Sequence, residues 1–267
     1  RHTRFRNVTG VQTCALPISC GVFCPYRRSA QNGAIKDAPT RKVTLDTPMT
    51  TDMSREAISA MRRSYGEAGL SEESAHSDPI AQFHIWLKDA ATNPVIVEAN
   101  AMVLSTMSAS GPTSRTVLLK DVTDEGFTFF TNYTSRKAEE ISRNSLVSLL
   151  FPWYPMERQV IVTGGAAKIS ESASSEYFAT RPWSSQIGAW ASDQSAELDS
   201  RETLEARWKE IAEKYPEGTA VPKPPHWGGF LVKPVTIEFW QGRYSRLHDR
   251  LRYELVDSNW KRRRIFP

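Results

Sequence analysis

Residues 115–131, RTVLLKDVTDEGFTFFT, have the composition of two β-strands joined by a tight turn. β-Branched and apolar residues dominate positions 115–122, and Phe and Thr make up positions 127–131. Between the two runs, Asp124-Glu125-Gly126 is a turn sequence, because Gly adopts the backbone angles that a tight hairpin needs. The stretch predicts an antiparallel hairpin and favours a fold built by sequential strand pairing.

Further strand-like runs occupy residues 101–107, 146–151, 158–169, 229–240, 247–256 and 260–266, and Gly164-Gly165 predicts a bulge in one of them. Helical spacing or capping signals mark residues 54–65, 78–93, 135–143, 174–180 and 198–215. The strands follow one another through short connections and do not alternate with helices. The sequence therefore predicts a mainly β (α+β) fold, an antiparallel barrel with peripheral helices.

The bulk composition is that of a soluble globular protein, with 40% hydrophobic and 24% charged residues among 267. The 34 Lys and Arg exceed the 30 Asp and Glu by only four, and part of that excess lies at the two ends of the chain. We therefore expect no nucleic-acid partner, whereas anionic small molecules remain candidate ligands. We also expect no membrane partner, because no apolar run approaches the length of a membrane span.

The three cysteines, Cys14, Cys20 and Cys24, all lie in the first tenth of the chain. The rest of the chain suits a reducing compartment, and we expect a cytoplasmic protein. Residues 8–18 resemble the translation of a sequencing-library adapter, so we interpret residues 1–19 as an assembly artefact; the alternative is an Arg-rich targeting peptide. We expect residues 20–50 to form the rest of a disordered leader and residues 51–267 to form a single domain.

Three segments carry candidate chemistry, and the first is residues 115–120. Strand alternation predicts one face with Arg115, Val117 and Leu119 and another with Thr116, Leu118 and Lys120. Lys120 at a strand end can present its charge to a phosphate or to an electron-rich ring. On this segment alone, a strand with exposed basic ends explains the pattern better.

The second segment, residues 129–137, runs from a strand into a helix with Ser135 as its expected N-cap and with Arg136 and Lys137 in its first turn. Free N–H groups, a hydroxyl and two cations at a helix start can form an anion site. Cations there oppose the helix dipole, so they are mildly unfavourable without an anion. An anion site and a solvated helix start both remain open.

The third segment, residues 238–250, contains Arg246, His248 and Arg250 at alternate positions. In an extended chain these side chains would share one face, where they would repel one another unless an anion were present. A lone His is usually structural, but a His in register between two arginines is a better site candidate. The sequence has no dinucleotide, Walker, zincin or nucleophile-elbow motif.

Together these segments resemble the pyridoxine 5′-phosphate (pyridoxamine 5′-phosphate) oxidase family. The resemblance runs from residue 61 to residue 267, and its most specific strings are residues 115–120, 130–137, 157–160, 184–190, 227–229 and 238–250. It implies a split β-barrel of the FMN-binding type and a homodimer with FMN at the subunit interface. The implied reaction oxidises pyridoxine 5′-phosphate or pyridoxamine 5′-phosphate to pyridoxal 5′-phosphate, by hydride transfer to the flavin, with O2 as acceptor and H2O2 as product.

The resemblance also implies roles for individual residues, and none of them binds a metal. The implied FMN contacts are Arg115, Val117, Leu118, Lys120, Phe130, Thr131, Arg136, Lys137, Gln159, Gln194, Ser195, Trp240 and Arg250. The implied substrate contacts are Arg62, Tyr65, Lys120, Tyr177, Arg181, Ser185, Arg246 and His248, of which Arg246 and His248 flank the reacting ring as catalytic residues. Phe266 departs from the Ala that is more frequent in the family, which puts the packing at that position in doubt.

Two other functions remain open from the sequence. One is a split-barrel flavoprotein with a different substrate, such as a flavin reductase. The other is a non-catalytic module that binds pyridoxal phosphate or a polyanion. Arg181 separates the first alternative from the oxidase, because a substrate without a phosphate would not need it.

Overall fold

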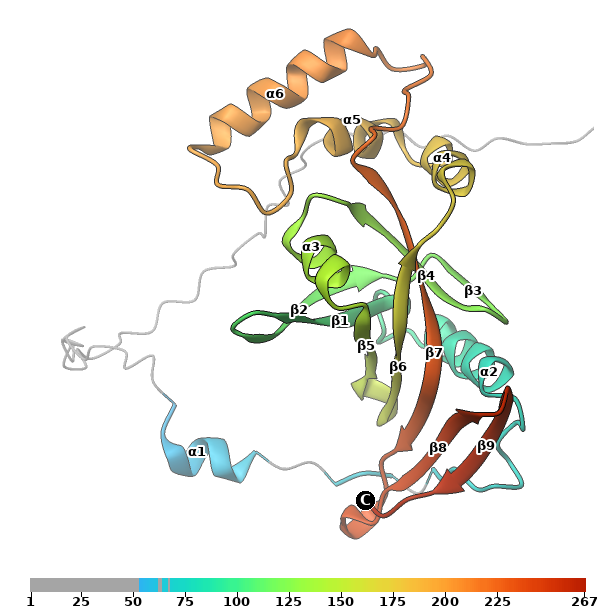
Figure 1. Ribbon diagram of the computed structural model, residues 1–267. Helices are drawn as coiled ribbons and strands as arrows, with labels where there is room; N and C mark the ends of the chain where they lie inside the picture. Colours follow the sequence, from blue (N-terminus) through green and yellow to red (C-terminus); the bar gives the residue numbers. More distant parts are fainter. Residues whose placement is uncertain (1–52, 62–63, 67) are drawn as a thin grey trace, which may run out of the picture. The chain divides into compact units, whose positions relative to one another are not determined.

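Figure 1 presents the computed structural model, which describes residues 53–61, 64–66 and 68–267. The chain divides into two units, residues 1–58 and 59–267. Helix α1 (Arg55–Ala60) begins as expected, since the Ser54 hydroxyl oxygen accepts a hydrogen bond from the Ala57 N–H at 3.1 Å. The expected helix over residues 54–65 was too long, because the chain is not helical at Tyr65. The predicted leader, residues 1–50, lies outside the described residues.

The described strands form one antiparallel sheet with the order β2-β1-β5-β6-β7-β4-β3, in which β8 pairs with β7 and with β9. The strands are β1 (Ala101–Ser108), β2 (Gly111–Leu118), β3 (Asp121–Thr123), β4 (Gly126–Asn132), β5 (Leu146–Trp153), β6 (Arg158–Lys168), β7 (Trp227–Gln241), β8 (Asp249–Val256) and β9 (Asn259–Arg264). Sequential hairpin pairing confirms the predicted mainly β class.

The run over residues 115–122 is two strands and not the single strand that we expected. The Leu119 N–H donates to the Asn100 carbonyl oxygen at 2.8 Å, and the Lys120 N–H donates to the Thr128 carbonyl oxygen at 2.8 Å. The chain therefore leaves β1 and joins β4 between these two residues. Lys120 therefore lies outside β2 and does not follow the alternation of side chains that we expected over residues 115–120.

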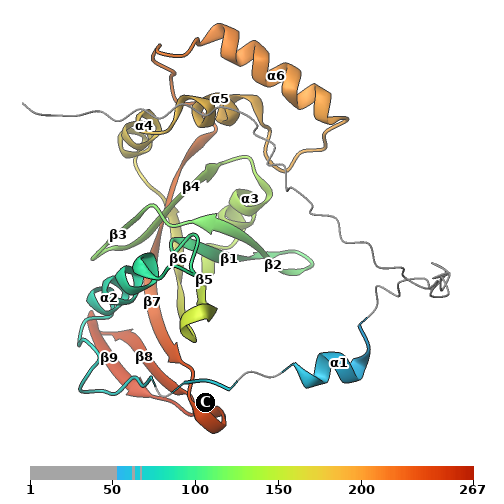
Figure 2. The same cartoon turned by 180° about the vertical axis from the view of Figure 1, so that it is seen from behind.

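Helices flank the sheet, as Figures 1 and 2 show from opposite sides. They are α2 (Pro79–Thr92), α3 (Arg136–Arg143), α4 (Glu171–Ala179), α5 (Trp183–Ala191) and α6 (Arg201–Lys214), with single turns η1 (Tyr154–Met156) and η2 (Tyr244–Arg246). Both views place α4, α5 and α6 beside the first residues of β7, and β8 and β9 beside its last residues. Within the described part of the chain, no helix is both long and apolar enough to cross a membrane.

The main core lies where α2 covers the sheet. Asp78 caps α2 by accepting the Ile80 N–H at 3.0 Å, as its sequence predicted. Phe83 is fully buried, and its ring lies edge-on to Phe127 and Phe151, with centroid distances of 4.9 and 4.8 Å. Because Phe127 belongs to β4 and Phe151 to β5, one side chain ties two strands of the sheet to the helix.

The predicted irregularity is present, because the pairing of β6 with β7 shifts between Thr163 and Gly164, but the extra residue is Val235 of β7. A Cβ atom on Gly164 would collide with the Lys233 carbonyl oxygen, so only glycine permits this close approach of the two strands. The irregularity also accommodates Pro234, which cannot donate a ladder hydrogen bond. The bulge lets β6 and β7 continue together as a long pair.

We expect Phe83→Ala to lower the free energy of unfolding by about 3–5 kcal/mol, because it removes a fully buried ring from the contact between α2 and two strands. Denaturant unfolding of the apoprotein at fixed protein concentration measures this change. Ile85→Ala, on the 48% exposed side chain two residues away, is the control and should cost less than about 1 kcal/mol. Equal losses in the two variants would contradict the assigned core.

Candidate functional site

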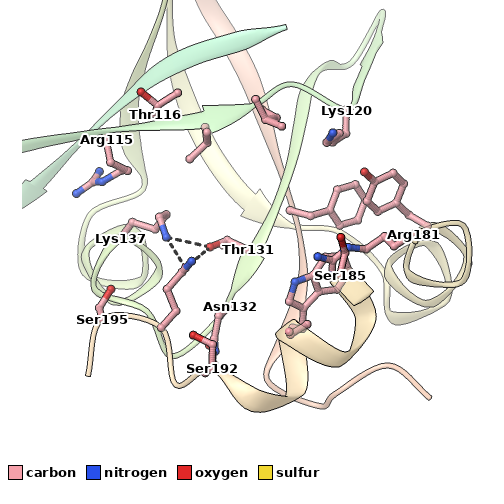
Figure 3. Close-up of a pocket in the computed structure, with 18 of the residues that line it drawn as sticks. Arg115, Thr116, Lys120, Thr131, Asn132, Lys137, Arg181, Ser185, Ser192 and Ser195 are labelled. Carbon is pink, nitrogen blue, oxygen red and sulfur yellow. Dashed lines mark hydrogen bonds between the residues drawn. The ribbon is translucent and has the colours of Figure 1, made fainter. Parts of the chain in front are cut away.

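A cavity of about 1050 Å³ opens between the strands β2 and β4 and the helices α3, α4 and α5 (Figure 3). Most of the residues predicted from the sequence line it, namely Arg115, Val117, Leu118, Lys120, Phe130, Thr131, Arg136, Lys137, Tyr177, Arg181, Ser185, Gln194 and Ser195. Thr116 also lines the cavity, so the predicted separation of residues 115–120 into two faces does not describe the site.

Five cationic side chains line this cavity, and no Asp or Glu does among the described residues. Figure 3 places Arg115 and Lys137 on one side of the cavity and Lys120 and Arg181 on the other. Like charges in a partly enclosed space repel one another unless an anion joins them. The arrangement is therefore suited to a ligand with two separated anionic groups, or to two anionic ligands.

Lys137 is the most enclosed of the cations, with 8% of its surface exposed. Its Nζ donates to the Gln194 Oε1 at 2.6 Å and to the Thr131 Oγ1 at 3.1 Å, and no carboxylate in the described chain forms an ion pair with it. Burial, and then the neighbouring Arg115 charge, lower the pKa of Lys137 to about 8. The ammonium group therefore lies next to the cavity with neutral partners only.

Ser135 does not act as predicted at the start of α3. Its backbone has N-cap geometry, but its side chain makes no capping hydrogen bond to the helix. The hydroxyl instead donates to the Asn132 carbonyl oxygen at 2.7 Å, and the fully buried residue does not line the cavity. The two cations of the first helical turn, Arg136 and Lys137, therefore line the cavity without the expected hydroxyl.

Glu140 is a further residue at this side of the cavity, and no sequence motif pointed to it. Its carboxylate is 3% exposed and forms ion pairs with Arg136 at 2.9 Å and with Arg115 at 3.0 Å. The spacing of four residues from Arg136 is the signal that could have identified the first pair. The second pair joins residues far apart in sequence, so only the fold brings it about.

On the opposite side, Arg181 has a buried Nη1 that makes no hydrogen bond within the described chain. Its guanidinium lies over the Trp227 ring, 4.6 Å from the centroid. Burial lowers the pKa of Arg181, and the nearby Tyr177 acts in the opposite direction. A buried donor without a partner in the chain is uncommon in folded proteins, and a ligand atom would complete it. The observation fits an anionic group at this position.

A stack of flat rings forms the cavity wall next to Arg181. The Phe130 and Tyr177 rings are 3.9 Å apart between centroids and inclined by 15°, and Phe130 and Trp227 are 5.3 Å apart and inclined by 11°. Phe130 comes from β4, Tyr177 from α4 and Trp227 from the start of β7. Three elements therefore fix an apolar, planar wall beside a cation, which suits a planar anionic ligand.

The remaining predicted residues form a second cluster at the other end of β7. The Trp240 and His248 ring centroids are 4.6 Å apart, and the Tyr65 ring lies edge-on to both at 5.8 and 5.3 Å. Gln159 and Arg250 lie opposite Trp240 on the two neighbouring strands. Twelve residues of β7 lie between Trp227 and Trp240, a strand length of roughly 40 Å. Within one chain, this cluster therefore lies far from the cavity. The predicted residue Arg62 lies outside the described residues.

The predicted shared face of Arg246, His248 and Arg250 is wrong. Arg246 lies in the turn η2, where it and Ser245 have positive φ angles of 62° and 55°, so the backbone does not alternate as a strand does. Arg250 is neutralised by Glu238, at 2.7 Å. The expected repulsion among the three groups is therefore reduced by both the turn and the ion pair.

His248 has a defined hydrogen-bonding state in this cluster. Its Nδ1 accepts the Arg243 N–H at 3.1 Å, so the neutral ring carries its proton on Nε2. Burial, and then the Arg246 charge, lower the pKa of His248. At neutral pH the ring is therefore a donor through Nε2, and its only lone pair is already engaged.

The antiparallel sheet with its peripheral helices is a split β-barrel of the FMN-binding type. The solved structure of a pyridoxamine 5′-phosphate oxidase-related, FMN-binding protein from Nostoc punctiforme has the same fold, with a TM-score of 0.58 and 17% identity over 71% of this chain and 98% of that chain. The structure of PhzG from Burkholderia lata, in complex with tetrahydrophenazine-1-carboxylic acid, matches with a TM-score of 0.70 and 32% identity over 75% of this chain and 99% of that chain.

The chain belongs to the pyridoxamine 5′-phosphate oxidase family. Residues 89–215 match the family described as pyridoxamine 5′-phosphate oxidase, and residues 227–267 match the pyridoxine 5′-phosphate oxidase C-terminal dimerisation region. A pyridoxine/pyridoxamine 5′-phosphate oxidase from Streptomyces avermitilis is 50% identical over 213 residues, which cover 78% of this chain and 95% of that protein. Its counterpart from Rubrobacter xylanophilus is 50% identical over 214 residues, covering 80% and 98%.

We expect Lys137 in the ligand-free protein to titrate near pH 8, well below the ordinary lysine value of about 10.4, because it is buried beside Arg115. Side-chain NMR measures this pKa, with Lys137→Arg identifying the resonance. A bound phosphate group should raise the pKa again, because an anion favours the charged form. Anion binding above pH 8 would then take up a proton, and affinity would fall as pH rises. A Lys137 pKa above 10 in the ligand-free protein would contradict the assigned environment.

Proposed function

We propose that this chain is an FMN-dependent oxidase that converts pyridoxine 5′-phosphate or pyridoxamine 5′-phosphate to pyridoxal 5′-phosphate, with O2 as electron acceptor and H2O2 as product. The observation that carries the proposal is the cavity with five cations in two groups and no lining carboxylate in the described chain. One group suits the phosphate of a flavin and the other suits the phosphate of a substrate. Family membership and relatives at 50% identity support the same reaction.

The cofactor would be held on the side of the cavity where α3 begins. Arg136 and Lys137 would bind its phosphate with Arg115 beside them, and Val117, Leu118, Phe130, Thr131, Gln194 and Ser195 would line the rest of its site. When bound, FMN would supply the hydride acceptor for the C4′ carbon of the substrate and would pass the electrons to O2. The cations of the chain would hold the cofactor by its phosphate and favour negative charge in the cavity.

The substrate phosphate would lie at Arg181, with Tyr177 and Ser185 as further donors and with Lys120 on the same side of the cavity. The Nη1 of Arg181, which has no partner in the described chain, would supply a charge-assisted hydrogen bond to this phosphate. The ring stack of Phe130, Tyr177 and Trp227 keeps this guanidinium in position and excludes water from one side. The chain thus orients a phosphorylated ring by its phosphate end.

We further propose that the functional unit is a homodimer in which the cluster around His248 completes the cavity of the other subunit. Trp240, Arg246, His248 and Arg250 all lie in the matched dimerisation region, residues 227–267. His248 would donate from Nε2 to the substrate, and Arg246 would place a charge beside the ring, while Gln159, Trp240 and Arg250 would complete the flavin site. Tyr65 would cover the substrate together with Arg62. The absence of cysteine after Cys24 supports a cytoplasmic location.

Arg181→Ala tests the substrate. We expect FMN to bind unchanged, whereas the pyridoxamine 5′-phosphate concentration needed for half-maximal reduction should rise about 10- to 100-fold, because a charge-assisted hydrogen bond is lost. Anaerobic bleaching of the flavin absorbance measures both quantities. Arg201→Ala, on an exposed Arg of α6 paired with Glu205, is the matched control. If Arg181→Ala reduced normally, a flavin reductase or another split-barrel flavoprotein would be favoured instead.

Mixed dimers test the shared site. One subunit carries Arg181→Ala and the other His248→Ala, with two affinity tags to isolate the mixed species. If each site joins one cavity to the other subunit's His248, one of the two sites has no substitution, and the mixed dimer should retain about half of the wild-type activity. If instead each chain held a whole site, both sites would carry a substitution, and activity would remain as low as in the single-variant homodimers.

A further inference from the structure

Glu140 is a buried carboxylate that the proposed reaction does not itself use. It lies on α3, one turn after Arg136, and is 3% exposed. It does not line the cavity, whereas the two arginines that it contacts both do. Apart from its charge, which acts through space, it can affect a ligand only through the lining residues that it contacts, Arg115, Arg136 and Thr113.

Each oxygen of the Glu140 carboxylate has its own donors. The Oε1 accepts the Arg136 Nε–H at 2.9 Å. The Oε2 accepts the Thr106 hydroxyl at 2.5 Å, the Thr113 hydroxyl at 2.6 Å and the Arg115 Nη2–H at 3.0 Å. Burial alone would raise the pKa of Glu140, but these hydrogen bonds outweigh it and lower the pKa to about 2. The group is therefore ionised throughout the physiological range.

The same threonines also hold Arg115 from a second direction. The Arg115 Nη2 donates to the Thr113 hydroxyl at 2.5 Å, and its Nη1 donates to the Thr106 hydroxyl and to the Leu104 carbonyl oxygen, the latter at 3.2 Å. Arg115 from β2 and Arg136 from α3 are thus joined through one carboxylate, together with β1. Two long side chains with many free rotamers are fixed before any ligand arrives.

The charges of this cluster match a phosphate. Arg115, Arg136 and Lys137 carry three positive charges, and Glu140 removes one, which leaves a net charge of two. A phosphate monoester carries about −1.5 to −2 near pH 7. Arg136 and Lys137 also lie at the start of α3, where the helix dipole disfavours cations, and the Glu140 ion pair offsets part of this cost.

We propose that Glu140 is a positioning residue for the cofactor phosphate: it holds the Arg115 and Arg136 guanidiniums at the cavity and sets the charge of the cluster to that of a phosphate dianion. The proposal rests on the proposed FMN site. Its alternative is a purely structural role, in which Glu140 only fastens α3 to β1 and β2. The two roles differ in what the loss of Glu140 does to a flavin that has a phosphate and to one that has none.

Glu140→Gln removes the charge and leaves one carbonyl oxygen where two oxygens served four donors. At least one arginine must then lose its fixed partner. We expect the FMN dissociation constant of the apoprotein to rise about 10- to 100-fold, which corresponds to the loss of one or two charge-assisted hydrogen bonds. The dissociation constant of riboflavin, which lacks the phosphate, should change less than about threefold. Quenching of flavin fluorescence measures both constants without any turnover.

Two further variants make the test selective. Glu139→Gln, on the exposed neighbour paired with Arg143, should leave both constants unchanged. Thr106→Val keeps every charge but removes the buried hydroxyl that lies between Glu140 and Arg115, and it should weaken FMN more than riboflavin by about 3- to 10-fold. This variant also preserves the test if Glu140→Gln does not fold, which thermal unfolding of the apoprotein checks.

Three outcomes would overturn the proposal. Equal weakening of FMN and riboflavin would indicate a structural role for Glu140. Unchanged constants in both variants would mean that the arginines need no positioning. Tighter FMN binding by Glu140→Gln would mean that the carboxylate competes with the phosphate. Failure of the wild-type apoprotein to bind FMN is a separate result, because it would refute the proposed function and not the role of Glu140.

Discussion

The length of β7 is the constraint on which the site depends. This strand pairs with β4, β6 and β8, so its two ends are held apart by three ladders of backbone hydrogen bonds. Trp227 at its start lines the cavity, and Trp240 near its end contacts His248. Because both clusters lie on one continuous strand, a single chain cannot bring the His248 cluster into contact with the cavity. A second copy of the chain can unite them, which is why the dimerisation region and the site are proposed to be one feature.

The cations that line the cavity raise the free energy of the ligand-free protein. Lys137 has neutral partners only, and Arg181 has a buried donor that the described chain does not satisfy. Both features destabilise the ligand-free fold, and both are relieved when an anion binds. Glu140 limits the cost on one side by neutralising one of three charges. The side with Arg181 has no such carboxylate among the described residues that line it, so an anionic ligand would offset the charges of Arg181 and Lys120 there.

Local patterns in the sequence were sufficient for most of the sheet. The hairpin at Gly126 and the irregular pairing at Gly164 were predicted because glycine is required at each place for a backbone reason that neighbouring residues reveal. Helix α2 was predicted because Asp78 and Pro79 mark its start. Helix α5 was missed, since no helix was expected between residues 180 and 198, whereas Pro182 directly precedes the first residue of α5. That helix is stabilised by the burial of Ile187 and Ala191, which a local pattern does not report.

The site was predictable in its residue types but not in its arrangement. The arginines and lysines of the cavity were identified by family resemblance, and the cavity does bring most of them together. The ion pairs of Glu140 with Arg115 and of Glu238 with Arg250 were not, because each depends on side chains that pairing or packing brings close. The positive φ of Arg246 was also hidden, since Arg has no local preference for that region. The alternation of residues in the sequence therefore overestimated the repulsion among Arg246, His248 and Arg250. It also gave no sign of the Glu140 carboxylate that offsets the charge of Arg115 and Arg136.

Burial has the same direct effect on Lys137 and His248, since it disfavours the charged form of both and lowers both pKa values. The consequences differ because the proposed tasks differ. His248 is useful when neutral, since the Arg243 N–H occupies Nδ1 and leaves Nε2–H as a fixed donor. Lys137 is useful only when charged, which a pKa of about 8 allows at neutral pH, and a bound phosphate extends the charged state to higher pH. Burial thus favours a neutral donor in one cluster, and in the other it couples anion binding to proton uptake above pH 8.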